Sequence, residues 1–230
     1  INQLLKQEAT LPEGDLKLDQ CKGNIRFDHV TFTYPATGIK ALDDISIEAK
    51  TGERIAIVGK TASGKSTLAE LLLGMYLPDN GTITIDGINI RRIDKASLRQ
   101  FIGYVPQDVF LFSDTVTHNI IFGASQKTQE DAAAFAEYAS VKDDILRLPN
   151  QFDTVVGERG VTLSGGQKQR ISIARALIKN PEIVILDDCL SAVDTETEQK
   201  ILTYLNTALA GKTAIVITHR LTSLIDFDRI

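Results

Sequence analysis

A short apolar run at residues 54–58 leads directly into a loop that carries two glycines. The loop fits the pattern G-x-x-x-x-G-K-[ST], and its members are Gly59, Lys60, Thr61, Ala62, Ser63, Gly64, Lys65 and Ser66. Leucines at helical spacing follow from Thr67, so the N-terminus of a helix is expected to point at the same centre as the N–H groups of the loop. The order of strand, loop and helix predicts that this loop binds the phosphates of a nucleotide, and Thr67 is counted among the binding residues. Lys65 would face the β and γ phosphates, and the Ser66 hydroxyl would face Mg²⁺.

Strand and helix patterns alternate along the rest of the chain. Apolar or alternating runs predict strands at residues 24–34, 42–49, 54–58, 82–90, 183–186 and 214–218. The run at 82–90 follows Asn-Gly and is broken by Asp-Gly, so it is predicted to be a hairpin. Helices are expected at 67–76 and from Gly165 to the stop at Pro181, with short helical stretches from 108 to 159. This alternation predicts an α/β fold: a P-loop NTPase core with a mostly parallel sheet, an N-terminal antiparallel β-subdomain and a helical subdomain at about 108–178.

Composition excludes some classes of protein. The net charge of −5 argues against a nucleic-acid partner, which would normally meet a basic face. Cys21 and Cys189 make no disulfide framework, so a reducing compartment is expected. No apolar run approaches the roughly 20 residues that span a bilayer. The chain starts at Ile1 rather than at Met, so we expect a piece of a longer protein, with 1–23 as a linker or arm, 24–230 as one domain, and its C-terminal end cut short.

A second glycine-bearing turn precedes the helix that runs to Pro181. It reads Leu-Ser-Gly-Gly-Gln at 163–167, and its polar members are Ser164, Gly165, Gly166 and Gln167. Taken alone, this turn is explained equally well as a helix N-cap at Ser164 with small neighbours.

The turn at 163–167, with Lys-Gln-Arg after it, resembles the signature motif of the ABC ATPases, and the other motifs of that family follow in the expected order. Tyr34 before Pro35 resembles the aromatic on which adenine stacks, and Gln107 resembles the Q-loop glutamine. Residues 183–187, ending in Asp187, resemble Walker B. The run Ser191, Ala192, Val193 and Asp194 resembles the D-loop. His219, in Thr-His-Arg at 218–220, resembles the switch histidine. The resemblance covers about 24–230, although Tyr34, Gln107 or His219 alone would be read as ordinary packing or turn residues.

The resemblance implies a Mg²⁺-dependent ATPase that works as a pair. The signature turn would cap the γ-phosphate of ATP bound to a second nucleotide-binding domain, so Ser164, Gly165, Gly166, Gln167 and Asp194 are assigned to the nucleotide together with Tyr34, Gln107 and the P-loop. Ser66, Gln107 and Asp187 would surround the metal. The catalytic group would be Asp188, His219, Gln107 and Lys65.

A run before the signature turn points to one branch of the family. Residues 154–160, Thr-Val-Val-Gly-Glu-Arg-Gly, resemble the exporter X-loop, and Phe112 to Val116 with Asn119 and Ile120 also look exporter-like. These features imply ATP-driven export through a transmembrane domain in the same or a partner chain, at the cytoplasmic face of a membrane. The alternative is a non-transport ABC ATPase that acts on ribosomes or another macromolecular machine. The transported substrate would be set by the membrane domain.

Asp188 departs from the family pattern, in which a glutamate follows the Walker B aspartate. Its carboxylate is one methylene shorter, and misplacement of roughly 1 Å can cost on the order of 10²-fold in rate. This departure predicts a slow site, as in the weakened subunit of a heterodimeric exporter. Because His219 is retained, a homodimer with a slow but working site is the alternative.

Overall fold

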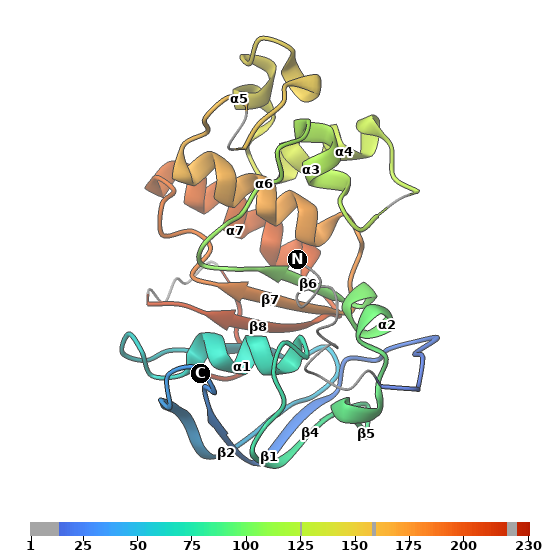
Figure 1. Ribbon diagram of the computed structural model, residues 1–230. Coiled ribbons are helices and arrows are strands. Elements are labelled where there is room, and N and C mark those ends of the chain that lie inside the picture. Colours follow the sequence, from blue (N-terminus) through green and yellow to red (C-terminus); the bar gives the residue numbers. More distant parts are fainter. Residues whose placement is uncertain (1–13, 125, 158–159, 220–224) are drawn as a thin grey trace, which may run out of the picture.

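The computed structural model describes residues 14–124, 126–157, 160–219 and 225–230, and it contains two four-stranded sheets with helices around them (Figure 1). The central sheet has the order β3 (Arg54–Ile57), β8 (Thr213–Ile217), β7 (Ile183–Asp187) and β6 (Ile102–Val105), and all its pairs are parallel. Every residue of β7 and β8 is buried. Both strands are short apolar runs, as expected where helices cover both faces of a parallel sheet.

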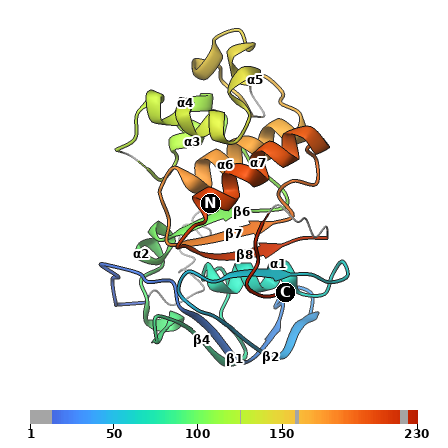
Figure 2. The same cartoon turned by 180° about the vertical axis from the view of Figure 1, so that it is seen from behind.

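The two faces of the central sheet carry different helices. Helices α6 (Gly165–Leu177) and α7 (Thr195–Ala208) cover one face, and α1 (Lys65–Leu72) lies on the other (Figures 1 and 2). Alternate residues of β7 and β8 divide between two hydrophobic clusters, because side chains of a strand point to opposite faces in turn. The α6 and α7 side takes Val184, Leu186, Ala214 and Val216, and the α1 side takes Ile183, Ile185, Ile215 and Ile217.

The second sheet is antiparallel and lies below α1 in Figure 1, on the side of α1 away from the central sheet. Its order is β2 (Lys40–Ala49), β1 (Ile25–Thr33), β4 (Asn80–Ile85) and β5 (Ile88–Asn89). Its buried side chains join those of α1 in one cluster. A 3₁₀ turn (Ile90–Arg92) follows β5 and leads to the rest of the chain.

The chain from β6 to α6 forms a small helical lobe above the central sheet (Figures 1 and 2). It contains α3 (Val116–Ile121), α4 (Gln129–Tyr138), α5 (Lys142–Leu146) and a 3₁₀ turn (Gln151–Asp153). Its apolar side chains share one cluster with α6 and α7, so the signature helix belongs to both the lobe and the core.

The predicted fold class is confirmed: a parallel core, an N-terminal antiparallel sheet and a helical lobe are all present. Helix α2 (Lys95–Gln100), strand β6 and helix α7 were not expected from the sequence. Strand β6 is short, and Gly103 within it lets α6 approach closely, since a Cβ there would lie 2.6 Å from the carbonyl oxygen of Ala176. Sequence patterns do not report such contacts.

Residues 14–22, expected to be part of a linker or arm, run along the antiparallel half of the domain. The Leu16 amide donates to the carbonyl of Arg92 at 2.9 Å, and the Asp94 amide donates to the carbonyl of Leu16 at 2.8 Å. Residues 1–13 lie outside the described part, so the domain boundary stays a prediction. None of the helices in the described ranges has the length and apolar character required to cross a bilayer.

Candidate functional site

The loop between β3 and α1 adopts the conformation that its glycines allow. Gly64 has φ of 86° and forms the N-cap of α1, and a Cβ on it would lie 2.3 Å from the carbonyl oxygen of Ala41. Any side chain at this position would therefore combine backbone strain with a collision against the backbone of β2. No acidic residue occupies the first turn of α1, so the helix N-terminus opens on the loop without a competing negative charge.

Lys65 folds back over this loop. Its side chain is 8% exposed, and its ammonium donates to the carbonyl oxygens of Gly59 at 3.0 Å and Lys60 at 2.8 Å. These neutral acceptors hold a positive charge at the mouth of the loop without neutralising it. A phosphate placed there would receive a charge-assisted hydrogen bond from Lys65.

Asp187 ends strand β7 beside the loop and is 2% exposed. Burial raises the pKa of its carboxyl above the ordinary value, while a side-chain hydrogen bond with Ser66 acts in the opposite direction. A nearby cation would offset the cost of burying this carboxylate. The hydroxyl and the carboxylate are also oxygen donors of the kind that Mg²⁺ prefers.

The described residues contain no group of three or more His, Cys, Asp or Glu side chains that could hold a metal ion. A magnesium ion at Ser66 and Asp187 would therefore take most of its ligands from phosphate oxygens and water, as is usual for this ion. The residues present fit a Mg²⁺–nucleotide complex better than a metal bound by protein alone.

Tyr34 directly follows the last residue of β1 and lines the same pocket as Asp187. Its hydroxyl is 2.9 Å from the Thr67 hydroxyl and donates to the Glu70 carboxylate at 2.7 Å. Its ring also makes edge contacts with Phe32 and Tyr76. Both ends of the side chain are thus held, which gives a flat base a fixed surface to stack on.

One pocket brings most of the predicted site residues together, although they come from five separate segments. The predicted residues that line it are Tyr34, Thr61, Ala62, Ser63, Gly64, Lys65, Ser66, Thr67, Gln107, Asp187, Asp188 and His219. Gln107 and His219 are exposed. Gly59 and Lys60 do not line the pocket, but their carbonyl oxygens accept hydrogen bonds from Lys65, which does. Parallel strands gather these groups because their carboxyl ends meet at one edge of the sheet.

The same pocket contains four residues that sequence reasoning missed: Ile39, Lys40, Ala41 and Ile217. Ile217 is the last residue of β8. The other three belong to the turn after Tyr34 and the start of β2, and the Tyr34 amide donates to the carbonyl of Ile39 at 2.9 Å. Ile39 is 61% exposed, so its apolar side chain is open to contact with a ligand in the pocket. Nothing in the local sequence marked these residues as part of a pocket.

The signature turn does not line this pocket. The Ser164 hydroxyl accepts from the Gln167 amide at 3.2 Å, and the Gln167 side chain accepts from the Ser164 amide at 3.0 Å, which makes a reciprocal cap for α6. Ser164 and Gly165 are exposed. Asp194, also exposed, caps α7 by accepting from the Thr197 amide at 3.0 Å. Their predicted contact with a nucleotide therefore requires a nucleotide outside this pocket.

The exporter-like run at 154–160 lies only partly in the described chain. Val155 is 45% exposed, the Val156 amide donates to the carbonyl of Asp114 at 2.9 Å, and Gly157 packs against Phe112. Glu158 and Arg159 lie outside the described residues, as does Arg220 after His219. The role expected of this run stays a prediction.

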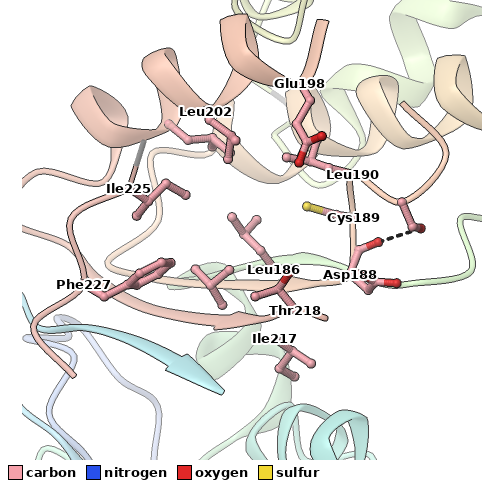
Figure 3. Close-up of a pocket in the computed structure, with 13 residues that line it drawn as sticks. Leu186, Asp188, Cys189, Leu190, Glu198, Leu202, Ile217, Thr218, Ile225 and Phe227 are labelled. Carbon is pink, nitrogen blue, oxygen red and sulfur yellow. Dashed lines mark hydrogen bonds between the residues drawn. The ribbon is translucent and has the colours of Figure 1, made fainter. Parts of the chain in front are cut away.

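A second cavity lies behind Asp188, between α7 and the central sheet (Figure 3). Apolar side chains dominate its walls, among them Leu186, Leu202 and Phe227, and no Lys or Arg occurs among its described lining residues. The buried thiol of Cys189 faces it, and burial raises the pKa of that thiol to about 12, so the thiol stays neutral. Such a cavity does not suit a phosphate.

Comparison with known proteins agrees with this geometry. Residues 42–191 match the protein-family model described as ABC transporter. The "Probable multidrug resistance ABC transporter ATP-binding/permease protein YheI" of Bacillus subtilis (strain 168) is 45% identical over 231 residues, covering 100% of this chain and 40% of that protein. The mitochondrial "Iron-sulfur clusters transporter ABCB7" of Danio rerio is 44% identical over 209 residues, covering 91% of this chain and 28% of that protein.

A solved structure resembles the whole described fold. "Structure of a bacterial Atm1-family ABC exporter with ATP bound" superposes with a TM-score of 0.90 and 41% sequence identity, covering 98% of this chain and 40% of the other. The chain thus spans less than half the length of each of these relatives.

Proposed function

Because this chain belongs to the ABC transporter family, we propose that it binds and hydrolyses MgATP to drive the export of a substrate through a transmembrane partner. One observation carries the proposal: a single pocket joins the glycine loop and Lys65 to the carboxylates of Asp187 and Asp188. Hydrogen-bond donors for phosphate thus lie in the same pocket as the groups that would hold a metal ion and a water molecule.

The residues of the pocket divide the work of phosphoryl transfer. Lys65 and the amides of the loop would bind the β and γ phosphates, and Tyr34 would stack on the base with Ile39 beside it. Ser66, Asp187 and Gln107 would hold Mg²⁺, which neutralises charge on the phosphates when bound. The chemistry depends on positioning and charge, and these residues supply both.

The γ-phosphate of the bound nucleotide would lie next to Asp188 and His219. Asp188 would accept a hydrogen bond from the attacking water and orient it, while His219 would contact the γ-phosphate. Since aspartate is one methylene shorter than glutamate, we expect slow hydrolysis at this site.

The exposed signature turn supports an ATP-dependent pair of domains. Ser164 and Gly165 at the start of α6 are exposed and do not line the chain's own pocket, so Ser164 and the first amides of α6 could bind the γ-phosphate of a nucleotide on a second domain. That second domain would be another copy of this chain or a related subunit. Binding of ATP would favour the closed pair, and loss of the γ-phosphate would release it.

The membrane partner is proposed from the relatives, whose names include a permease, a transporter and an exporter. We place the domain at the cytoplasmic face of a membrane, attached to a transmembrane domain. The alternative of an ABC ATPase acting on ribosomes has no counterpart among these relatives.

The decisive experiment is the substitution Lys65→Ala. It should abolish or strongly weaken MgATP binding and hydrolysis and leave the circular dichroism spectrum unchanged, because Lys65 is the first residue of α1 and alanine favours a helix. Lys200→Ala, an exposed lysine paired with Glu196 on α7, makes the same change in net charge and should have no effect. Unchanged MgATP affinity in Lys65→Ala would refute the assignment of the site.

A further inference from the structure

Gln169 connects the signature helix to the D-loop through both atoms of its side-chain amide. It lies in the first half of α6 and is 5% exposed. Its oxygen accepts from the Ala192 amide at 3.1 Å, and its nitrogen donates to the Ser191 hydroxyl at 3.2 Å. The orientation of the amide is determined, because a backbone N–H can only donate and must face the oxygen.

Ser191 extends this connection to Asp188. Its hydroxyl accepts from Gln169, so its own proton is free to be donated to the carbonyl oxygen of Asp188, which lies 3.0 Å away (dashed line in Figure 3). Asp188 has φ of 44°, a left-handed conformation that is uncommon outside glycine but is adopted by aspartate and asparagine more readily than by most residues. Its amide donates to the carbonyl of Ile217 at 2.8 Å, and its carbonyl accepts from both the amide of Ser191, at 3.4 Å, and the hydroxyl of Ser191.

The signature turn also rests directly on the D-loop. A Cβ on Gly166 would lie 2.7 Å from the carbonyl oxygen of Ala192, and one on Gly165 would lie 3.5 Å from the Ala192 side chain. The two glycines therefore allow a backbone approach that no larger residue permits at position 166. The turn, Gln169 and the D-loop are therefore in direct contact.

We propose that Gln169 is a positioning residue for ATP hydrolysis, which holds Asp188 in place and transmits the position of the signature turn to it. This inference rests on the proposed function, in which Asp188 orients the attacking water. Gln169 itself does not line the pocket and touches no phosphate. A nucleotide on the second domain that binds the signature turn would then also hold the Asp188 carboxylate of this chain's own site in position.

The test measures ATPase kinetics of the intact transporter with Gln169→Leu, Ser191→Ala and the double variant. Gln169→Leu keeps the size of the side chain and removes both hydrogen bonds. We expect kcat to fall about tenfold, since misplacement on the scale of 1 Å can cost up to about 10²-fold. The KM for ATP should change by less than about twofold, because the loop and Tyr34 are untouched.

Thr117→Val is the matched control. Thr117 is 8% exposed in the helical lobe, and its hydroxyl donates to the carbonyl of Phe152 at 3.1 Å. The variant removes one buried hydrogen bond without touching the D-loop, so it should lose stability but keep kcat. If Gln169→Leu does not fold, Ser191→Ala carries the test, since Ser191 is exposed and its loss costs little packing.

The double variant separates a chain of contacts from two independent effects. If Gln169 acts through Ser191, the double variant should lose no more than the larger single loss. Wild-type kcat in both single variants, equal losses in Thr117→Val, or losses that multiply in the double variant would each overturn the inference. Lys65→Ala in the same assay tests the proposed function separately: its loss of hydrolysis alongside a wild-type Gln169→Leu would refute the positioning role alone.

Discussion

Asp187 and Asp188 are neighbours in sequence, but only Asp187 continues the strand. Asp187 is 2% exposed at the end of β7, whereas Asp188 leaves the strand with φ of 44° and is only partly buried. The turn between them gives each carboxylate a different environment. Both residues line the pocket of the glycine loop, but the Asp187 carboxyl is buried next to Ser66, whereas Asp188 is partly exposed.

The burial of Asp187 leads to a prediction about stability. Asp187→Asn should raise the melting temperature of the nucleotide-free protein at pH 7 to 8 and should abolish Mg²⁺-dependent hydrolysis. The folded pKa of Asp187 is raised by burial, so the ionised carboxylate costs stability above that pKa. In a chain of this size, each 1 kcal/mol of stability gained raises the melting temperature by about 2–4 °C.

The same reasoning gives the pH dependence. As the pH falls toward the pKa of the unfolded chain, about 3.9, the carboxyl of the folded wild type becomes neutral and the advantage of the asparagine should shrink. Melting curves at pH 4 and pH 8 in the presence of a chelator measure this difference. An advantage that is equal at both pH values would contradict the assigned cause.

Lengthening the neighbouring carboxylate should speed hydrolysis. Asp188→Glu adds one methylene, leaves the charge unchanged, and should raise the ATPase rate of this site tenfold or more if carboxylate length is the main defect. The rate must be measured in an intact transporter whose other site, if it belongs to a different chain, has been inactivated.

Asp188→Asn is the control for this prediction. Asparagine tolerates the left-handed backbone as aspartate does but carries no charge, so it should lower the remaining activity. If neither variant changes the rate, Asp188 does not orient the attacking water.

A cation in the signature turn should block pairing of domains. Ser164→Arg places a bulky side chain where the γ-phosphate of the facing nucleotide would bind, so ATP-dependent dimerisation measured by sedimentation should be lost. Affinity of the monomer for ATP, measured by fluorescence, should be unchanged because Ser164 does not line the pocket.

Thr128→Arg is the matched control for the lost helix cap. Thr128 is exposed and caps α4 with the same reciprocal hydrogen bonds, and loss of such a cap costs about 1 kcal/mol. It should lower stability similarly and leave dimerisation intact. A loss of monomer affinity in Ser164→Arg would show that the turn contacts its own nucleotide.

A single methyl group at position 64 should distort the phosphate-binding loop. In Gly64→Ala the new Cβ would meet the carbonyl oxygen of Ala41 at 2.3 Å, so the loop must move and ATP affinity should fall by at least tenfold. Gly87→Ala is the control, because Gly87 also has a positive φ, of 79°, but nothing lies within 4 Å of its Cβ. It should cost about 1 kcal/mol of stability and leave binding unchanged. Titration of both variants with ATP distinguishes collision from backbone strain alone.

Local chemistry made several features predictable from sequence. The loop at 59–66 needs glycine, lysine and serine at fixed spacing, and β7 and β8 need uninterrupted apolar runs because both faces of each strand are covered. These requirements act on neighbouring residues, so they are visible in the chain order. Helix α7 escaped prediction because its buried residues are only Ile201, Leu202 and Leu205 among many polar ones.

Other features depend on residues that are distant in sequence. The sequence contains Ile39 and Gln169, but nothing local to either shows that one lines the pocket or that the other holds the D-loop 22 to 23 residues away. Gly103 and Gly166 likewise matter for the backbones they meet, those of Ala176 and Ala192. The amino-acid sequence determined which chemistry this chain can perform, because phosphate and metal ligands must be of particular types at particular spacing. Only the packing of α6 against the D-loop decided how those ligands are held, because hydrogen bonds and close contacts between separate segments exist only once the chain has folded.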